Sequence, residues 1–355
     1  MTGVLRIAII ASARFPIREP FAGGLESHTW YLARALRRRG HELTVFAAPG
    51  SDPGLGVDLL PVDTVALSAA ARADASMRPE WWMAEHHAYL RLMLDLAERP
   101  DRFDVVHNNS LHHLPVALAP LLSTPVVTTL HTPPTPWLES AIRARPDNGV
   151  VFVAVSAHTA AAWRPLVPDA LVIRNGIDLD EWSPGPGGGP LVWTGRITPE
   201  KGTHLALDAA RHADRPLLVA GPIADTGYWR SEVEPRLDGR IRYVGHLGRR
   251  ELRDLVAAAS AVLVTPCWDE PYGLVVAEAL ACGTPVAGFA IGALPELVDD
   301  TCGRLVPPGD VAALAAVIPE TTALPRSAAR RRAERDWAHP RMVDEYVRLY
   351  EQVAA

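Results

Sequence analysis

The chain has 355 residues, which is enough for two domains of ordinary size. Apolar residues make up 48% and charged residues 21%, values that are typical of a globular chain and exclude a disordered one. The 35 Lys and Arg residues against 41 Asp and Glu give a net charge of −6, which argues against a general nucleic-acid-binding protein.

The cysteines and the apolar runs restrict the cellular setting. Cys267, Cys282 and Cys302 are too few and too scattered for a disulfide framework or a zinc knuckle, and they fit a reducing compartment. No run approaches the roughly 18 apolar residues that span a bilayer. The run at residues 7–10 is shorter than the core of a signal peptide, so we interpret it as a buried strand. We therefore expect a cytoplasmic protein without a transmembrane segment, and peripheral membrane contact is left open.

Short apolar runs alternate with longer amphipathic ones in the first half of the chain. The pattern predicts strands at residues 5–11, 42–47, 103–107, 125–131, 150–156 and 171–174. It predicts helices at residues 25–39, 79–98, 111–122 and 157–164. Alternation of this kind indicates an α/β domain with a doubly wound parallel sheet.

A stretch rich in Gly and Pro, residues 182–190, interrupts the alternation and is predicted to be an exposed loop or linker. Strands are then predicted at residues 191–194, 217–220, 241–245, 261–265, 285–289 and 304–306. Helices are predicted at residues 203–212, 249–258, 273–282 and 294–299. The second half is therefore predicted to be a second α/β domain.

The C-terminal segment, residues 326–353, is predicted to form one or two helices. Its apolar stripe consists of Met342, Tyr346, Leu349 and Val353. We interpret the arginine run at residues 330–332 as a solvated helix face rather than a nucleic-acid or membrane patch.

Ligands of doubly wound sheets bind beyond the carboxyl ends of the strands, and the strongest motif follows such a strand. It begins at Glu270, which the following proline keeps out of helical geometry. Gly273 opens a helix, and the free amides of Gly273 and Leu274 make an anion site. Glu278 lies about one turn inside this helix. The two carboxylates indicate recognition of hydroxyl groups; the alternatives are a surface acid and a buried ion-pair partner.

A second motif follows the first strand of the second half. Arg196 and Lys201 stand five residues apart across a turn, where they can clamp one anionic group such as a diphosphate. Lys201 is the sole lysine of the chain, which suggests a position where arginine would not serve. The alternative is a basic surface turn.

Weaker signals lie in the first half. Gly23 and Gly24 precede a helix and permit close approach of the backbone to a phosphate or sugar. His131 follows a strand, where it can bond sugar hydroxyls, transfer a proton or be structural. His107 and Asn109 end another strand and are candidates to line the cleft.

Metal sites are not expected, because we find no cluster of His or Cys with ligand spacing. His112 and His113 are interpreted as neighbours without a role. The sequence Asp178-Leu179-Asp180 is interpreted as turn chemistry and a helix cap. No nucleophile elbow of the Gly-x-Ser-x-Gly type is present.

With these motifs together, the sequence resembles the family-4 retaining glycosyltransferases over nearly its whole length. The resemblance is carried by residues 23–26, 38–45, 104–107, 175–178, 195–202 and 270–286. It implies the B-type fold of two facing Rossmann-like domains. We expect an acceptor-side domain at residues 1–172, a nucleotide-sugar domain at residues 173–337, and a C-terminal helix at residues 338–355 that returns to the first domain.

The resemblance also implies roles for the second-domain motifs. Arg196 and Lys201 are expected to hold the donor diphosphate. Glu270 is expected to contact hydroxyls of the transferred sugar, with the amides of Gly273 and Leu274 near sugar and phosphate.

The nucleoside is expected at the other end of the same site. Glu278 is expected to form a hydrogen bond with the ribose. A loop containing Val244, His246 and Leu247 is expected to contact the base.

In the first domain, His131 is expected to reach the donor sugar near the reaction centre. Gly23 and Gly24 are expected to let this domain approach the diphosphate. The candidate acceptor-side residues are Glu26, His107 and Asn109. The least typical stretch, residues 68–99, is expected to shape acceptor specificity.

The implied reaction moves a hexose-type sugar from a nucleotide diphospho-sugar to a hydroxyl acceptor, with retention of configuration and without a metal cofactor. UDP is expected in preference to GDP on general grounds, and the acceptor is a glycan, a glycolipid or a small natural product. Two alternatives stay open: a sugar-nucleotide epimerase of the same fold, and a non-catalytic two-lobed sugar-nucleotide binding protein. The sugar, the acceptor and the oligomeric state are not indicated.

Overall fold

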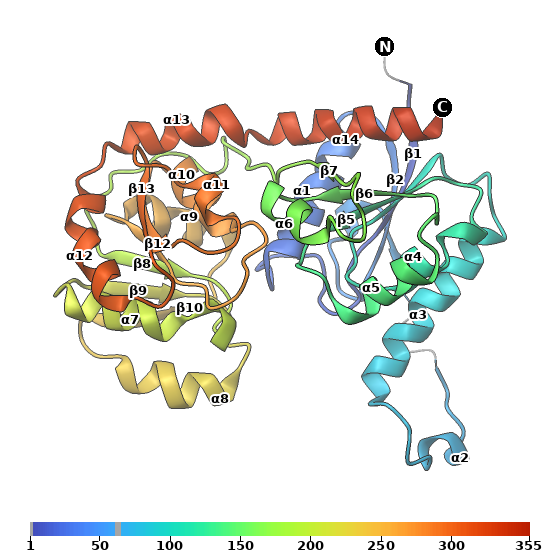
Figure 1. The fold of residues 1–355 in the computed structure, drawn as a ribbon, viewed down its shortest axis with the longest axis horizontal. Coiled ribbons are helices and arrows are strands. Elements are labelled where there is room, and N and C mark those ends of the chain that lie inside the picture. The colour runs from blue at the N-terminus through green and yellow to red at the C-terminus, as the bar shows by residue number, and fades with distance from the viewer. Residues whose placement is uncertain (1–2, 61–64) are drawn as a thin grey trace.

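The computed structural model describes residues 3–60 and 65–355. These residues form two lobes, each built on a parallel β-sheet with helices on its faces, and two helices at the C-terminus run across both lobes (Figure 1).

The first sheet has seven strands in the order β3-β2-β1-β4-β5-β6-β7, and every pair is parallel. The strands are β1 (Arg6–Ile10), β2 (Glu42–Ala47), β3 (Val57–Leu59), β4 (Val105–Asn108), β5 (Val126–Leu130), β6 (Val150–Ala154) and β7 (Leu171–Val172). The order reverses between β1 and β4, which opens a crevice at the carboxyl ends of these strands.

The second sheet has six strands in the order β10-β9-β8-β11-β12-β13, again all parallel. The strands are β8 (Leu191–Thr194), β9 (Leu217–Ala220), β10 (Ile241–Gly245), β11 (Val262–Val264), β12 (Val286–Phe289) and β13 (Gly303–Val306). Its order reverses between β8 and β11, so both domains have the doubly wound topology predicted from the alternation.

Helices connect the strands and cover the sheets. Those of the first lobe are α1 (Gly24–Arg38), α2 (Ala69–Arg72), α3 (Glu80–Ala97), α4 (Leu114–Ala117), α5 (Pro136–Ala144) and α6 (Ala157–Trp163). Those of the second lobe are α7 (Thr203–His212), α8 (Thr226–Tyr228), α9 (Arg249–Ala258), α10 (Leu274–Ala281), α11 (Leu294–Leu297) and α12 (Val311–Thr322). The chain closes with α13 (Arg326–Asp336) and α14 (His339–Ala354).

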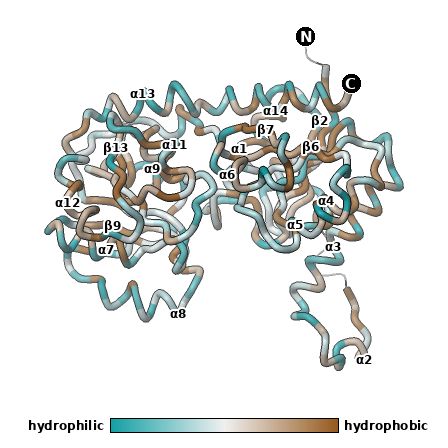
Figure 2. Tube along the Cα trace, in the orientation of Figure 1, coloured by the Kyte–Doolittle hydropathy of each residue, from teal (hydrophilic) through white to brown (hydrophobic). Residues whose placement is uncertain are grey.

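Burial of the strands explains their composition. All four residues of β8 and of β12, and all five of β5, are buried, as the continuous apolar runs require for strands covered on both faces. Figure 2 shows the hydrophobic segments inside both lobes and more polar residues along α8 and α13. Each lobe therefore has its own apolar core, which holds its strand ends in place.

The C-terminal helix returns to the first lobe, as the resemblance implied. The crossing point pairs Ile177 with residues 337–339 through two backbone hydrogen bonds, Ile177 N to Trp337 O at 2.7 Å and His339 N to Ile177 O at 3.0 Å. A Cβ added at Gly176 would lie 2.7 Å from the Cα of His339, so only glycine fits this close crossing. From there α14 packs against α1 and β4 with the stripe Met342, Tyr346 and Leu349 buried.

The structure corrects the interpretation of the arginine run. Arg330 donates hydrogen bonds to the carbonyl oxygens of Trp182, Ala281 and Leu179, and Arg332 donates to that of Glu296. Each of these two side chains is only 18% exposed. The run therefore fastens α13 to the second lobe, and only one of its three members is an exposed residue.

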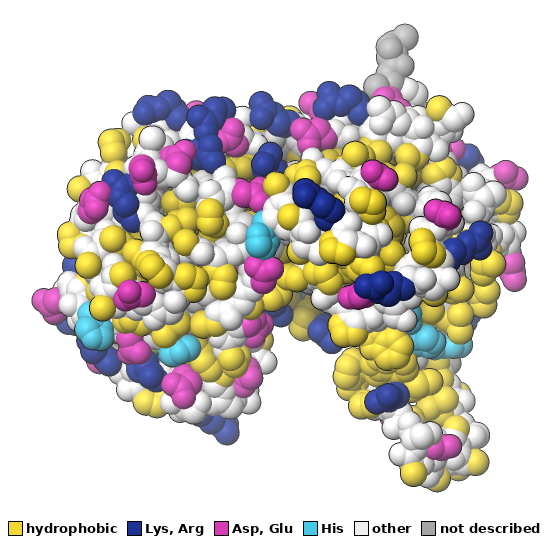
Figure 3. Space-filling model, in the orientation of Figure 1, with side chains coloured by type: hydrophobic (Ala, Val, Ile, Leu, Met, Phe, Trp, Pro, Cys, Tyr) yellow, Lys and Arg dark blue, Asp and Glu magenta, His cyan; other side chains and the backbone are white. Residues whose placement is uncertain are grey.

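An arm formed by α2 and the first half of α3 projects from the first lobe (Figure 1). In Figure 3 hydrophobic side chains gather at the base of this arm, with histidine side chains beside them. Among the described residues, no helix is both long enough and apolar enough to cross a membrane.

Candidate active site

A cavity of about 300 Å³ lies between the two lobes, and residues from the strand ends of both domains line it. Its size matches that of small-molecule sites. Most of the residues predicted from the motifs share this lining: Gly23, Gly24, His131, Arg196, Lys201, His246, Leu247, Glu270, Gly273, Leu274 and Glu278.

Lys201 is held at the cavity by an ion pair. A 3₁₀ turn at Pro199–Lys201 follows β8, and Nζ of Lys201 lies 2.5 Å from Oε2 of Glu270. The indole of Trp268 donates a second hydrogen bond to the same oxygen at 2.8 Å, and its ring centre lies 5.0 Å from Nζ. The ammonium group therefore sits between a carboxylate and an aromatic face, where a compact charge fits better than a planar guanidinium.

Gly202 explains why this turn is so close to the neighbouring strand. Its backbone is left-handed, with φ of +62°, and a Cβ there would lie 2.1 Å from the carbonyl oxygen of Thr265, just beyond β11. The turn that carries Lys201 is thereby packed onto the end of the neighbouring strand.

Arg196 lies opposite the glycine pair of the first domain. A Cβ added at Gly23 would lie 3.8 Å from Cδ of Arg196, and one added at Gly24 would lie 2.9 Å from Cδ1 of Leu274. The side chain of Arg196 is 37% exposed, and its Nη2 lies 3.8 Å from Oε1 of Glu200, which is too far for a hydrogen bond. Its N–H donors are therefore available to a ligand.

The amino end of α10 faces the same cavity. Gly273 caps the helix in the left-handed region with φ of +93°, and Leu274 begins it. The first amides of a helix have no acceptor within the helix, and the helix dipole favours an anion there. Arg196, Lys201 and this helix end thus surround one space.

The loop that carries Glu270 is braced by the first domain. The hydroxyls of Ser156 and Thr159, at the start of α6, donate to the carbonyl oxygen of Pro271 at 2.7 and 3.0 Å. The Tyr272 hydroxyl donates to the carbonyl oxygen of Asn175 at 2.7 Å. The position of Glu270 therefore depends on the packing of the two lobes.

Glu278 faces the cavity from the second turn of α10. No hydrogen bond to its carboxyl group is formed within residues 3–60 and 65–355. Burial raises the pKa of this group to about 7. A partly protonated carboxyl group without a protein partner is suited to bond a hydroxyl group of a ligand.

His131 is an uncharged residue on the first-domain side of the cavity. Burial, and then the nearby His28 and His107, hold its pKa well below the usual range. Its Nε2 lies 2.7 Å from Oδ1 of Asn109, so Nε2 carries the proton and Nδ1 is left as an acceptor. Asn109 itself is fully buried and does not line the cavity, so the structure places it behind His131 rather than in an acceptor site.

Two other acceptor-side candidates also lie away from the cavity lining. His107 is fully buried, with Nε2 2.7 Å from the Thr129 hydroxyl and Nδ1 2.6 Å from the Tyr350 hydroxyl. Both ring nitrogens are engaged within the core, because α14 returns over β4, so the expected acceptor contact of His107 does not hold. Glu26 is buried beneath the glycine pair, and burial raises its pKa.

Of the loop expected to contact the base, only two of the three named residues line the cavity. His246 and Leu247 line the cavity, and Nε2 of His246 lies 3.0 Å from the carbonyl oxygen of Phe21. Val244 lies within β10 and is not part of the cavity lining.

Arg249 and Trp268 also line the cavity, and the sequence interpretation missed both. Arg249 pairs with Glu19 of the first lobe at 3.1 Å and with Glu181 at 2.7 Å. Its guanidinium also lies 4.8 Å from the centre of the Trp30 ring. Two consecutive arginines at residues 249–250 could have marked this position in the sequence. The acidic partners of Arg249 could not be predicted, because they are distant in sequence.

Three histidines that no ligand spacing in the sequence marked lie together in the structure. His86 of α3 joins His112 and His113, and one ligand atom from each lies within 4.8 Å of those of the others. None of the three lines the cavity between the lobes.

Two facing Rossmann-like domains with this cavity between their strand ends define a B-type glycosyltransferase fold. Residues 22–181 match Glycosyltransferase Family 4, and residues 189–322 match Glycosyl transferases group 1.

Two similar proteins come from mycobacteria. A glycogen synthase of Mycobacterium tuberculosis is 31% identical, with 87% of this chain and 84% of the relative covered. A D-inositol 3-phosphate glycosyltransferase of Mycolicibacterium smegmatis is 29% identical, with 94% and 88% covered.

A solved structure has the same fold. Anabaena Alr3699/HepE in complex with UDP-glucose superimposes with a TM-score of 0.76 at 19% identity, covering 98% of this chain and all of the other. The chain belongs to the family-4 glycosyltransferases, enzymes that use sugar-nucleotide donors.

Proposed function

We propose that the protein is a retaining, metal-independent hexosyltransferase that takes its sugar from a UDP-sugar and transfers it to a hydroxyl acceptor. The observation that supports this most is the meeting of Arg196, Lys201 and the amino end of α10 around one cavity between the domains. Three sources of positive potential at one point are suited to a diphosphate.

Breakage of the glycosidic bond leaves negative charge on the diphosphate. In the proposed mechanism, Arg196 and Lys201 meet this charge with the amides of Gly273 and Leu274, inside a space from which closure of the lobes excludes water. These groups are in place before the reaction, so little reorganisation is needed. Two cations and a helix end also supply the charge that a metal ion would otherwise provide, which supports metal independence.

Glu270 and Glu278 are proposed to recognise hydroxyl groups. Oε2 of Glu270 is engaged by Lys201 and Trp268, which leaves Oε1 for the transferred sugar. Glu278 is assigned to the ribose, whose hydroxyl group supplies the hydrogen-bond partner that this carboxyl group lacks among the described residues. His131 offers its Nδ1 as an acceptor to the sugar near the reaction centre.

Retention of configuration is proposed from the family resemblance. The acceptor oxygen attacks the anomeric carbon from the face that the diphosphate leaves. A departing phosphate oxygen takes the acceptor proton, so no enzyme carboxylate becomes bonded to the sugar. Preference for UDP is proposed because the structurally similar HepE was solved with UDP-glucose.

The test is to incubate the purified protein with a panel of UDP- and GDP-sugars, with EDTA present, and with hydroxyl acceptors of each class. Acceptor-dependent release of UDP, with a product whose anomeric configuration matches that of the donor by NMR, would support the proposal. An inverted product, dependence on a metal or preference for GDP would each remove the corresponding part. Epimerised donor without acceptor, or binding without turnover, would exclude a transferase.

A further inference from the structure

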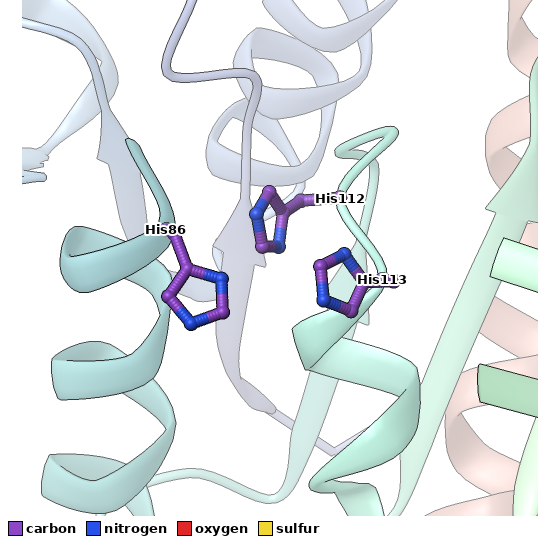
Figure 4. A group of neighbouring side chains, drawn as sticks. All are labelled: His86, His112 and His113. Carbon is purple, nitrogen blue, oxygen red and sulfur yellow. The ribbon is translucent and has the colours of Figure 1, made fainter. Parts of the chain in front are cut away.

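Three histidines meet outside the cavity between the lobes. His86 comes from α3, and His112 and His113 come from the connection between β4 and α4 (Figure 4). One ligand atom from each lies within 4.8 Å of those of the other two. Segments that are separated by more than 20 residues are thus joined at one point.

The spacing of the rings is close to that of a shared metal ion. Three imidazoles on one tetrahedral ion, with metal–nitrogen distances of about 2.1 Å, have ring centres about 5 Å apart. Here the ring centres are 5.8 Å apart for His86 and His112, 5.8 Å for His86 and His113, and 4.4 Å for His112 and His113. Their ligand atoms lie within 4.8 Å of one another, whereas nitrogens that share one tetrahedral ion stand about 3.4 Å apart, so the side chains must shift to bind an ion together.

The rings are chemically ready to act as ligands. Neutral imidazole, the form that coordinates metal ions, carries one unprotonated ring nitrogen with a free lone pair. Nδ1 of His86 is buried and has no hydrogen-bond partner among the described residues. Figure 4 shows a nitrogen of His86 directed toward the other two rings.

An aromatic neighbour supports each imidazole. The stacked pairs are His86 with Trp82 at 5.2 Å, His112 with Tyr89 at 4.4 Å and His113 with Trp137 at 5.2 Å between ring centres. Such support limits the rotation of the rings and lowers the entropy lost when a ligand fixes them.

One existing contact must be exchanged. The amide of Leu114 donates to Nδ1 of His112 at 3.2 Å, which makes Nδ1 the unprotonated nitrogen of that ring. Coordination through Nδ1 replaces this long hydrogen bond and leaves the proton on Nε2. The amide belongs to the first residue of α4, where no acceptor within the helix is expected in any case.

We propose that His86, His112 and His113 form a binding site for a divalent transition-metal ion, with Zn²⁺ as its occupant and water in the fourth position. Imidazole is a preferred ligand of such ions. The ion would tie α3, and with it the projecting arm, to the segment that includes Leu111, which lines the cavity. The site is separate from the donor groups, so it does not conflict with metal-independent transfer.

The test is equilibrium dialysis of the full chain against ZnCl₂, with metal analysis, and titration with Co²⁺ followed by visible absorption. We expect one bound Zn²⁺ per chain and the absorption bands of tetrahedral cobalt bound by nitrogen. His86→Ala and His113→Ala should each weaken binding by at least about 100-fold, since changes behind metal ligands already cost 10- to 100-fold. His87→Ala, on the same helix but outside the cluster, should bind as the wild type does.

The outcomes separate the cluster from the other ten of the 13 histidines. Less than one equivalent of Zn²⁺, or a cobalt spectrum without tetrahedral bands, would overturn the proposal from the wild type alone. Unchanged binding in both alanine variants would also overturn it, because another site would then hold the ion. Circular dichroism in EDTA verifies that the variants are folded, and the wild-type cobalt spectrum decides the matter if they are not.

Discussion

Replacement of Lys201 by alanine tests the donor site at a cation that an ion pair and an aromatic ring hold in position. The lysine side chain is 22% exposed, pairs with Glu270 at 2.5 Å and lies over Trp268. Loss of one preorganised donor to developing charge in a water-excluded site costs about 10²–10³ in kcat, or about 3–4 kcal/mol. We therefore expect Lys201→Ala to lower turnover by about that factor.

The cost in stability should be much smaller. Glu270 keeps its hydrogen bond from Trp268, and water can enter the space that the lysine vacates, so we expect a loss of about 1 kcal/mol. Initial rates of sugar transfer and urea unfolding measure the two effects separately. Arg230→Ala is the matched control, since this exposed cation of the same domain does not line the cavity.

A second substitution sharpens the test. Lys201→Arg keeps the charge, but the planar guanidinium does not match a site shaped around a compact ammonium group. We expect this variant to lose most of its activity as well. Full turnover in Lys201→Ala would refute the assignment of Lys201 to the diphosphate, and full turnover in Lys201→Arg would refute the shape argument.

Three further expectations concern the buried groups. The native state holds the Glu278 proton up to about pH 7, whereas the unfolded chain releases it near 4.5. As the pH rises from about 4.5 to about 7, the wild type should therefore lose about 3 kcal/mol of unfolding free energy relative to Glu278→Gln, as measured by urea unfolding. Equal pH profiles for the two proteins would contradict the raised pKa. Gly176→Ala should cost about 1–3 kcal/mol through its clash with α14, whereas Gly239→Ala, in open space, should not; equal melting temperatures would remove the crossing argument. Tyr350→Phe should cost about 1–2 kcal/mol and leave the acceptor KM unchanged, and a changed acceptor KM would restore a ligand role for His107.

Much of the fold follows from local pattern. The expected strands at residues 42–47, 191–194, 217–220 and 241–245 coincide with β2, β8, β9 and β10. The apolar run of β8 is buried throughout, as in a strand covered on both faces, whereas β2 and β10 mix exposed and half-buried residues with buried ones. The sequence pattern did not predict three elements of the structure, α12, α5 and β3. Helix α12 contains Pro319, α5 begins at Pro136 after two further prolines, and β3 is only three residues long.

The candidate site was predictable where its residues follow a strand directly. Arg196, Lys201 and Glu270 belong to such motifs, and the doubly wound topology brings their loops to one edge. Contacts made by packing of one lobe on the other could not be predicted, because they join distant segments. Arg249 with Glu19 is one example. The buried place of His107 is another, since it depends on α14 crossing back over β4.

The most direct test of the proposed donor site is a crystal structure of the protein with UDP bound. We expect the diphosphate within hydrogen-bonding distance of the Arg196 guanidinium, the Lys201 ammonium group and the amides of Gly273 and Leu274. A diphosphate bound elsewhere, with these groups directed away from it, would contradict the proposal that they stabilise the leaving group.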